Sequence, residues 1–535
     1  MGFVILSGME SLPATNETPY HIAIVGGGIN GVAIARDAAL RGLNVYLCER
    51  GDLAGATSSA SSKIAHGGLR YLETREFAMV RKSLREREVL LNIAPHLVTP
   101  MGFILPHASH LRPRWLIRLG LFIYDHLYRS RRIPRARGIT FAGSTAGQPL
   151  KNTYKKGFVY GDGWMDDARL VTLTALDAAE HGATIAPHTT CTEAVHDGKA
   201  WKITTESKAP DGTVSQQVVR AKTLVNAAGP WAERFLKTTH LEAHSKPLTL
   251  VKGSHIVVPR LFDHHNAYTL QTEDERVVFA FPYEKQFTLI GTTDTPHEGN
   301  PADARPDEEE IEYLCDTANR YFSQQITPED VVWAYSGVRP LIGSSDNSSQ
   351  SESGQSNISQ SKPSQSKASK ASRDYSLHLS KTLPLLNIWG GKLTAHRQLA
   401  EDAVNKLASA LGSLPTCTTA TTPLPGGDIA AEDLPALVRR LQGQHPRLNA
   451  GTADRLVRAY GTRAPDIFAG PDGPGQHFGG GLYQAEVDYL IRHEWARSVA
   501  DILWRRSKLG LHLSLADQTA LKDYVQGELE AENRA

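Results

Sequence analysis

Near the start of the chain, a short run of apolar residues is followed by apolar residues at helical spacing and then by a second short apolar run. Residues 21–25 and 44–48 are short, mostly apolar stretches, and stretches of this length are typical of buried strands. Between them, small apolar side chains recur at helical spacing over 32–39, and Gly42 marks the expected stop. The order strand, helix, strand predicts a βαβ unit over residues 20–50.

Similar patterns continue further along the chain. Apolar residues at helical spacing predict helices over 74–93 and 394–411, and Asp166 or Asp167 is placed to cap another helix. Alternating and β-branched segments over 247–295 predict a β-sheet in a second domain. Strands are also expected around 184–206, at 223–229 and at 385–389.

A chain of 535 residues is too long for one simple core, so two or three structural units are expected. Prolines in 412–428 indicate a linker, and residues 429–535 read as a mostly helical domain. Residues 344–372 are mostly Ser, Gln, Lys and Asn, which predicts a flexible insertion without a role in chemistry. Residues 1–19 are expected to be a disordered extension, with Met9 as an alternative start. The amphipathic segments of the helical domain are 430–442, 452–460 and 484–508.

Composition narrows the class of protein. The net charge is +1 and 21% of residues are charged, which argues against a general nucleic-acid binder. The four cysteines are far apart, so neither a disulfide framework nor a zinc site is indicated, and a reducing cytosolic setting fits. No stretch approaches eighteen uninterrupted apolar residues, so no membrane-spanning helix is expected.

The turn after the first predicted strand carries a nucleotide-binding pattern. Gly26, Gly28 and Gly31 give G-x-G-x-x-G, and Glu49 ends the second strand. Gly26 allows a tight turn, Gly28 lets a pyrophosphate approach the backbone, and Gly31 lets helix and strand pack closely. The helix N-terminus offers free N–H groups to phosphates, and Glu49 lies where a ribose hydroxyl needs an acceptor. The whole pattern predicts a bound dinucleotide.

Several short sequence motifs occur together, in the order in which one protein family has them. They closely resemble the FAD-dependent, aerobic glycerol-3-phosphate dehydrogenases, from about residue 20 to the helical end. The strings are Ser61-Ser62-Lys63, His66-Gly67-Gly68-Leu69-Arg70-Tyr71, Asp166-Asp167-Ala168-Arg169-Leu170, Asn226-Ala227-Ala228-Gly229-Pro230-Trp231, Lys252-Gly253-Ser254-His255, Gly291-Thr292-Thr293-Asp294, Tyr335-Ser336-Gly337-Val338-Arg339-Pro340, Arg373-Asp374-Tyr375, Gly390-Gly391-Lys392-Leu393-Thr394, His493-Glu494-Trp495 and Leu503-Trp504-Arg505-Arg506. The N-terminal extension and the Ser/Gln-rich insertion depart from the family pattern.

The resemblance implies an α/β fold: a Rossmann-like FAD-binding domain with a mixed-sheet substrate domain, like glucose oxidase and D-amino-acid oxidase, plus an α-helical C-terminal domain. It also implies oxidation of sn-glycerol 3-phosphate to dihydroxyacetone phosphate, with electrons delivered to a membrane quinone. Within a core of residues 20–411, the FAD-binding parts are about 20–75, 155–235 and 376–411, and the substrate-domain parts are about 76–154 and 236–343.

A small diol carrying a phosphate of charge near minus two calls for guanidinium groups, which match phosphate oxygens bidentately. In the resembling family the positions of Arg70 and Arg339 face the substrate phosphate. Tyr71 and Arg373 are weaker candidates, and the insertion makes the placement of Arg373 less certain than that of Arg339.

Hydride can leave the substrate C2 for flavin N5 only if the C2 hydroxyl loses its proton, so a base is needed. His255 on a predicted strand is the first choice, His66 the second, and Lys392 the third if desolvation lowers its pKa. No metal ligand set is indicated.

The FAD itself is expected to contact several loops. The turn at 390–394 can bring backbone and a helix N-terminus to the pyrimidine end of the ring, which becomes negative on reduction. Ser58, Ser59 and Lys63 are expected over the pyrophosphate and ribityl chain, and Ala228 and Gly229 near the nucleotide. The candidates in the turn at 390–394 are Gly390, Gly391, Lys392 and Thr394.

Residues 111–137 combine eight arginines with apolar and aromatic side chains. Such a stretch suits the surface of an anionic bilayer, and it is too short to span one. Peripheral attachment to the inner face of the cytoplasmic membrane is therefore expected, because a quinone lives in the bilayer. For the helical C-terminal unit, capping the core, forming a homodimer and binding a partner all stay open.

Three other functions compete with the dehydrogenase. A glycerol-3-phosphate oxidase would pass its electrons to O₂. An FAD-dependent amine or amino-acid oxidase would use arginine for a carboxylate. A flavin-binding regulator would not turn over at all, although the Lys, His and Arg residues around the expected flavin argue against it.

Overall fold

The computed structural model describes residues 19–108, 110–209, 212–274, 276–342, 374–470 and 473–532. The insertion expected at 344–372 and all but residue 19 of the extension expected at 1–19 lie outside these described residues. Arg373 also lies outside them.

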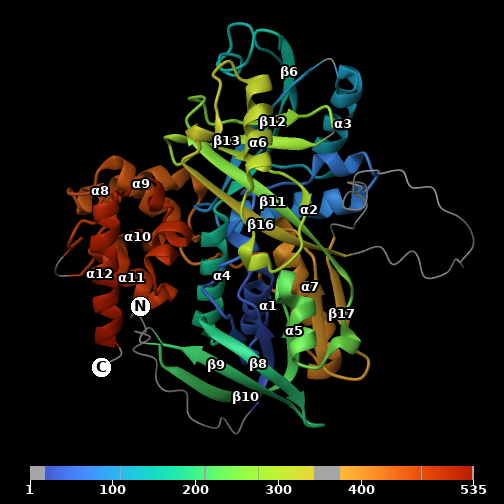
Figure 1. Ribbon diagram of the computed structural model, residues 1–535, viewed down its shortest axis with the longest axis vertical. Coiled ribbons are helices and arrows are strands. Elements are labelled where there is room, and N and C mark those ends of the chain that lie inside the picture. Colours follow the sequence, from blue (N-terminus) through green and yellow to red (C-terminus); the bar gives the residue numbers. More distant parts are fainter. Residues whose placement is uncertain are drawn as a thin grey trace, which may run out of the picture.

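The first of two sheets is the nucleotide-binding sheet, and its centre is parallel. Its order is β17–β18–β10–β1–β2–β7, and β17 alone runs antiparallel to its neighbour in that path. A ribbon of β8 and β9 extends from β10 (Figure 1). The bounds are β1 (Tyr20–Val25), β2 (Val45–Cys48), β7 (Thr184–Ala186), β8 (Thr189–His196), β9 (Trp201–Lys208), β10 (Val214–Asn226), β17 (Ser376–Leu379) and β18 (Leu385–Trp389).

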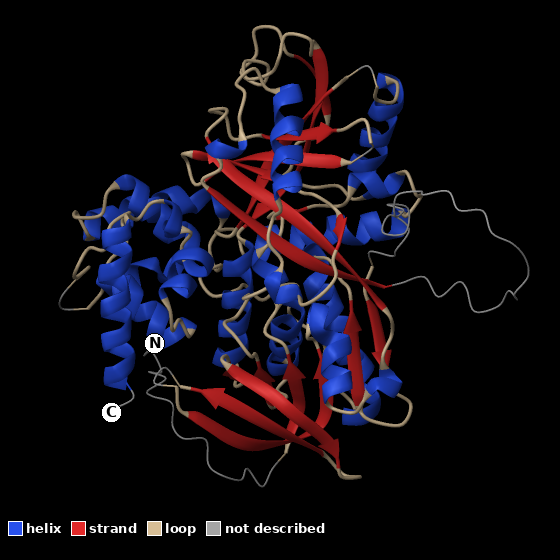
Figure 2. Cartoon of the chain, viewed as in Figure 1, coloured by secondary structure: helices blue, strands red, loops and turns tan. Residues whose placement is uncertain are grey.

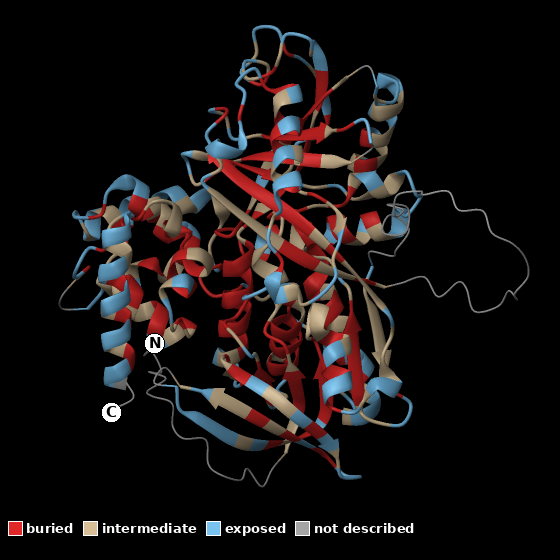
Figure 3. Ribbon diagram, in the orientation of Figure 1, coloured by how far each residue is buried: buried red, intermediate tan, exposed pale blue. Residues whose placement is uncertain are grey.

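Three helices pack against one face of this sheet. They are α1 (Ile29–Leu40), α4 (Asp167–Glu180) and α7 (His396–Leu411). Ala35 and Ala38 on α1 are fully buried, and such small side chains let α1 lie close to both neighbours. The other face packs against α5 (Ala232–Thr238) and a fully buried Trp201. Figure 3 shows the resulting buried core around α1 and α4.

The second sheet forms the rest of the core. Its order is β15–β11–β14–β13–β12–β4–β6–β3, with β16 paired to β11 and β5 to β6. It mixes parallel and antiparallel pairs, and α6 (Glu308–Tyr321) packs against it through Leu314 and Tyr321. The bounds are β3 (Ile64–Ala65), β4 (Val98–Pro106), β5 (Arg137–Thr140), β6 (Lys156–Met165), β11 (Leu248–Pro259), β12 (Ala267–Gln271), β13 (Val277–Tyr283), β14 (Phe287–Gly291), β15 (Thr295–Pro296) and β16 (Trp333–Ile342).

Two helices border the second sheet near its junction with the first. They are α2 (Phe77–Ile93) and α3 (Arg114–Leu127). The sequence predicted the start of α2 at residue 74, but a 3₁₀ turn, η2 (Leu69–Leu72), and a further turn at 73–75 precede Phe77. The side chain of Asp166 accepts from the N–H of Arg169 and so caps α4, as one of the two predicted caps.

The described C-terminal part is mostly helical (Figure 2), and it has a hydrophobic core of its own. Its elements are α8 (Leu434–Gln444), α9 (Ala450–Tyr460), α10 (Ala464–Ile467), α11 (Gln484–Glu494), a π-helical turn η11 (Asp501–Arg506) and α12 (Leu515–Glu532). The predicted helical segment 484–508 is interrupted at Trp495, which has a φ of 56°. The connection 412–428 is irregular and lies against α1, where Arg36 donates to the carbonyl of Thr422. The predicted fold class is confirmed: a parallel nucleotide-binding sheet, a mixed second sheet and a helical C-terminal domain.

Candidate active site

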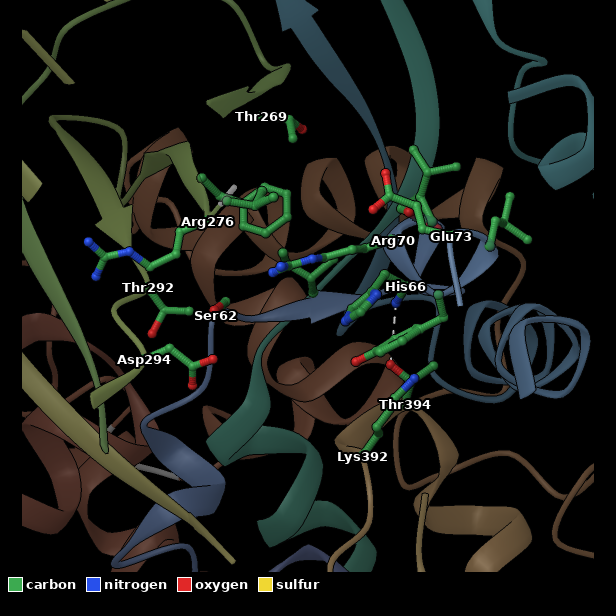
Figure 4. A pocket seen from close by; sticks show the side chains of 18 of the residues that line it. Ser62, His66, Arg70, Glu73, Thr269, Arg276, Thr292, Asp294, Lys392 and Thr394 are labelled. Carbon is green, nitrogen blue, oxygen red and sulfur yellow. Dashed lines mark hydrogen bonds between the residues drawn. The ribbon is translucent and has the colours of Figure 1, made fainter. Parts of the chain in front are cut away.

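A cavity of about 730 Å³ opens where the two sheets meet (Figure 4). Five separate segments contribute to its wall. They are the loop 57–62, the loop 66–73, strand β16, residues 292–294, and the turn 390–394. Residues from α3 close one side. Two of the segments predicted to contact FAD, at 57–62 and 390–394, therefore meet the segments of Arg70 and Arg339 at one cavity.

The glycine turn between β1 and α1 has the close contacts that the motif requires. Gly26 has a φ of +117°, and a Cβ on Gly31 would lie 1.9 Å from the carbonyl oxygen of Gly26. Glu49, at the end of β2, accepts hydrogen bonds from the N–H groups of Gly27 at 2.7 Å and Gly51 at 2.9 Å. Burial raises the pKa of the Glu49 carboxyl. A Cβ on Gly28 would approach Ser58 Oγ at 3.1 Å, so this turn is a cradle that only glycine leaves open.

The loop 57–63 holds its shape through its own contacts. Ser58 lines the cavity, and its Oγ accepts from the N–H of Ile29 at 3.0 Å. Ser59 and Lys63 do not line the cavity. The Lys63 ammonium is fully buried, 2.7 Å from an Asp167 carboxylate oxygen and 3.2 Å from the carbonyl of Ser59. Lys63 therefore fixes the loop against α4.

Ala228 and Gly229 lie beside the glycine turn, where η3 (Gly229–Trp231) begins. A Cβ on Gly26 would come within 2.5 Å of the carbonyl oxygen of Ala227 and 3.1 Å of the Cα of Ala228. Neither Ala228 nor Gly229 belongs to the wall of the cavity. They are on the nucleotide side of the site.

The turn 390–394 joins β18 to α7 and lines the cavity. Gly390 and Gly391 have φ values of +68° and +112°, which favour glycine. Asn30 of α1 donates to the carbonyl of Gly390 at 3.1 Å and so ties the turn to the nucleotide-binding helix. Thr394 Oγ1 accepts from the N–H of His66 at 3.3 Å.

Cationic side chains gather on one side of the cavity. Arg70 of η2 points into it, next to His66 and Lys392 (Figure 4). The Lys392 ammonium lies 3.7 Å from the ring centroid of Tyr71, a distance typical of a cation–π contact. Gly68, with φ +84°, lets the Tyr71 ring approach, because a Cβ there would lie 2.3 Å from that ring.

Arg339 reaches the same cavity from β16. Its guanidinium donates to Asp294 Oδ1 and to Thr292 Oγ1, each at 2.9 Å. These two bonds fix the plane of the guanidinium. Arg70 and Arg339 therefore approach one cavity from two different segments.

The three candidate bases differ in their access to the cavity. His66 and Lys392 line it. His255 on β11 is 1% exposed and does not, but its Nε2 lies 2.9 Å from the hydroxyl of Ser62, which does. Burial, with the positive charges of Arg339 and Lys63, lowers the pKa of His255 well below its ordinary value. His255 is therefore neutral near pH 7 and meets the cavity through Ser62.

Beneath the loop 66–71 lies a buried polar cluster that the sequence did not reveal. The N–H of Gly67 donates to the Tyr124 hydroxyl at 2.9 Å, and that hydroxyl donates to Asp162. Arg87 pairs with Asp162 at 2.7 Å. Burial raises the pKa of Asp162, although Arg87 opposes the shift. Tyr124 belongs to α3, so this helix braces the loop that carries Arg70.

Other residues of the cavity wall also carried no sequence signal. Arg276 lies outside the family motifs. Its guanidinium stacks on the ring of Tyr313, with Cζ 3.9 Å from the ring centroid. Ser62 is part of the Ser61-Ser62-Lys63 motif, but the motif gave it no role. Its importance follows only from its contact with His255, which is far away in the sequence.

Helix α3 leaves large apolar side chains in solvent. Trp115 is 69% exposed, Phe122 53% and Leu119 47%, and Leu119 also lines the cavity together with Leu116 and Ile117. Of the eight arginines in 111–137, seven are exposed and Arg132 is half-buried, donating to the carbonyl of Leu91. In the described part of the chain, helices fall short of the length and apolar character needed to cross a bilayer.

Comparison with known proteins agrees with these features. The family model described as FAD dependent oxidoreductase matches residues 21–375, and the model described as C-terminal domain of alpha-glycerophosphate oxidase matches residues 417–527. A glycerol-3-phosphate dehydrogenase of Pseudomonas aeruginosa is 47% identical over 515 residues, 95% of each chain. The aerobic glycerol-3-phosphate dehydrogenase of Escherichia coli is 41% identical over 511 residues, 94% of this chain and 97% of that one.

A D-erythritol 1-phosphate dehydrogenase of Brucella abortus is also similar, 43% identical over 506 residues, 94% of this chain and 96% of that one. Among solved structures, the glycerol-3-phosphate dehydrogenase of Bacillus halodurans complexed with FAD matches with a TM-score of 0.71 at 25% identity. The match covers 96% of this chain and 95% of that one. The resemblance identified from the sequence strings and the FAD cofactor are confirmed, and the chain belongs to the family of FAD-dependent oxidoreductases.

Proposed function

We propose that this protein oxidises sn-glycerol 3-phosphate to dihydroxyacetone phosphate and passes the electrons to a membrane quinone. The observation that carries the proposal is the meeting of Arg70, Arg339 and Lys392 at one cavity beside the nucleotide turn. This is a site for a small anion next to a flavin. The names of the P. aeruginosa and E. coli relatives support glycerol 3-phosphate as that anion.

The residues present fit FAD. The glycine cradle at Gly26, Gly28 and Gly31, with Glu49 and Ser58, would hold the nucleotide, and the turn 390–394 would border the ring. When bound, FAD supplies the acceptor for the hydride that leaves the substrate carbon. The protein supplies orientation and charge: the dipole at the start of α7 and the Lys392 ammonium favour negative charge in this part of the cavity.

The two guanidinium groups suit the phosphate of the substrate. Arg339 is held in one orientation by Asp294 and Thr292, so little rotamer freedom is lost when a phosphate binds. Arg70, from the loop 66–73, adds a second guanidinium group that can form paired hydrogen bonds to the phosphate. Tyr71 packs on Lys392 and positions its ammonium.

For the proton of the C2 hydroxyl, the geometry favours His255 acting through Ser62. The substrate O–H proton passes to Ser62 Oγ as the Ser62 hydroxyl proton passes to Nε2 of His255, so the proton count balances. The neutral imidazole can accept this proton, and a dianionic phosphate bound at Arg339 would offset the nearby positive charge that keeps the pKa of His255 low. His66 is the second candidate, because it lines the cavity directly.

The exposed apolar face of α3 supports peripheral contact with an anionic bilayer. Trp115, Leu119 and Phe122 would enter the headgroup region, and the surrounding arginines would meet anionic lipids. Because α3 also borders the cavity, a quinone in the bilayer would lie on the same side of the molecule as the site. These features support attachment to a membrane surface, and we propose the inner face of the cytoplasmic membrane as that surface.

Steady-state turnover of the FAD-loaded protein tests this function against its rivals. We expect glycerol 3-phosphate to drive reduction of a quinone analogue much faster than formation of hydrogen peroxide. A peroxide rate that matches the substrate consumed would instead indicate a glycerol-3-phosphate oxidase. Turnover with amino acids, or preferential turnover of D-erythritol 1-phosphate, would overturn the assigned substrate. If none of these compounds is turned over, the result would favour a flavin-binding regulator.

A further inference from the structure

A segment of five consecutive residues in the C-terminal domain, 504–508, contacts the catalytic core at three separate points. Trp504 stacks on the second sheet, and Lys508 meets the start of α4. Arg505 and Arg506 pair with Asp52 in the loop 49–56 after β2, which we call the nucleotide loop. The π-helical turn η11 directs two neighbouring arginines to the same carboxylate, and Lys508 follows with a φ of 61°. Irregular backbone of this kind is costly, which suggests that these contacts matter to the protein.

The first contact begins a ladder of aromatic rings that ends at His255. The rings of Trp504 and Trp333 are stacked, 4.5 Å apart and 24° from parallel. Trp333 lies 4.9 Å from Tyr335, two residues further along the same face of β16. Tyr335 lies opposite His255 in the β11–β16 register, and their rings stack 4.9 Å apart at 11°.

Tyr335 contacts both His255 and the residue that precedes Ser62, and so it can position both members of the Ser62–His255 pair. Its ring supports the face of the His255 imidazole, and its hydroxyl donates to the carbonyl of Ser61 at 2.9 Å. Ser61 precedes Ser62, whose hydroxyl meets His255. A shift of the Tyr335 ring would therefore move the imidazole and the serine loop together.

The charged residues of segment 504–508 contact the nucleotide loop and the start of α4, which in turn holds the loop that carries Ser61. Arg506 donates two hydrogen bonds to Asp52, at 2.6 and 2.7 Å, beyond the Glu49–Gly51 turn. Although burial opposes it, the charges of Arg506 and Arg505 hold the pKa of Asp52 below its ordinary value. Lys508 lies 3.5 Å from Asp166, and the adjacent Asp167 holds Lys63 and Ser61.

We propose that residues 504–508 of the C-terminal domain position the Ser62–His255 pair and the nucleotide loop, with Trp504 acting through Trp333 and Tyr335. The inference rests on the proposed function and assigns the C-terminal domain a part in the active site. Trp504 is a positioning residue, since it touches neither the cavity nor His255. A misplacement on the order of 1 Å can cost about 10²-fold in rate, so the ladder can matter to turnover without touching the substrate.

The test uses the full-length, FAD-loaded protein and four variants. Trp504→Leu removes the first ring of the ladder, and Trp504→Phe keeps an aromatic ring there. Phe478→Leu is the matched control, because Phe478 is also an aromatic residue of the C-terminal core, is more deeply buried than Trp504, and packs on Tyr524, outside the ladder. Tyr335→Phe keeps the ring stack and removes only the bond to the Ser61 carbonyl.

We expect Trp504→Leu to lower kcat for glycerol 3-phosphate by roughly 10- to 100-fold, with KM changed much less, because the phosphate site is untouched. Trp504→Phe should recover most of the rate, and Phe478→Leu should keep it. Hydrogen–deuterium exchange should increase in peptides covering 57–66 and 333–339 for Trp504→Leu but not for Trp504→Phe or Phe478→Leu. If that variant does not fold, Tyr335→Phe should still raise exchange in 57–66 and lower kcat.

Normal kcat and normal exchange in Trp504→Leu would overturn the inference, as would an equal loss in Phe478→Leu. The exchange measurement needs no turnover. A wild-type protein that fails to oxidise glycerol 3-phosphate would therefore reject the proposed function while leaving the positioning of the two loops testable.

Discussion

The Nε2 atom of His255 lies 2.9 Å from the hydroxyl of Ser62, and of these two residues only Ser62 lines the cavity. A buried neutral histidine behind a serine hydroxyl can accept a proton from the cavity without contacting the substrate. The arrangement makes the two residues one functional unit. It also separates His255 from His66, which faces the cavity itself.

Replacing either partner of this unit should therefore have the same type of effect. We expect Ser62→Ala and His255→Gln each to lower kcat by roughly 10²- to 10⁴-fold, the range for loss of a general base. The double variant should be little worse than either single variant, because the residues act in series. His66→Gln serves as the comparison in the same steady-state assay. If it alone abolishes turnover while Ser62→Ala retains it, His66 is the base.

The two arginines should act mainly on substrate affinity. Arg70→Ala and Arg339→Ala should each lower kcat/KM by roughly 10²-fold, because each removes charge-assisted hydrogen bonds worth about 1.5–3 kcal/mol. Arg440→Ala, on an exposed face of α8, is the control and should behave as wild type. Initial rates over a range of glycerol 3-phosphate concentrations give the comparison. Unchanged kcat/KM in both cavity variants would show that the phosphate binds elsewhere.

The nucleotide turn and its helix could be predicted from sequence because their causes are local, whereas the fold class followed from the resemblance to a known family. Glycine spacing and apolar period are readable within thirty residues. The contacts of Lys63 with Asp167 and of Ser62 with His255 join positions 104 and 193 residues apart, so no local pattern contains them. For the same reason the prediction that Lys63 lies over the cofactor did not include its ion pair with Asp167 of α4.

The apolar face of α3 should govern binding to lipid. The triple variant Trp115→Ser, Leu119→Ser, Phe122→Ser should bind anionic phosphatidylglycerol vesicles roughly 10²-fold more weakly, because it loses buried apolar surface at the bilayer. Vesicle sedimentation measures this. The matched control replaces three exposed valines by serine on the β8–β10 ribbon, which lies far from α3 in Figure 1: Val195, Val214 and Val218. Equal binding of both triple variants would contradict docking through α3.

His96 should make stability depend on pH. Burial lowers the pKa of His96 to about 3, and neither ring nitrogen has a hydrogen-bond partner among the described residues. Below pH 6.5 the unfolded chain binds a proton at this histidine that the folded chain refuses, so stability falls as the pH drops toward 3. Each pH unit in this window costs roughly 1 kcal/mol.

The substitution His96→Leu isolates this contribution. It should leave the protein at least as stable as wild type at pH 7, because no hydrogen bond to a described residue is lost. It should also flatten the fall in the urea midpoint between pH 6.5 and 4. The same slope in both proteins would assign the acid sensitivity to other groups.

The close packing of the glycine turn should be required for FAD retention. Gly31→Ala places a methyl group 1.9 Å from the Gly26 carbonyl oxygen, so the turn or the helix must move. We expect the purified variant to be largely colourless. Gly527→Ala on α12, where an added methyl group meets nothing, should keep its FAD and gain up to about 1 kcal/mol of stability. Equal flavin content in the two variants would argue against this turn as the nucleotide grip.

The most direct measurement is an anaerobic titration of the FAD-loaded protein with glycerol 3-phosphate, followed by the visible absorbance of the flavin. The account predicts bleaching by this substrate and none by amino acids. It also predicts that the double variant Arg70→Ala, Arg339→Ala needs far higher concentrations. A flavin that keeps its absorbance with glycerol 3-phosphate, or a double variant that bleaches as readily as wild type, would contradict it.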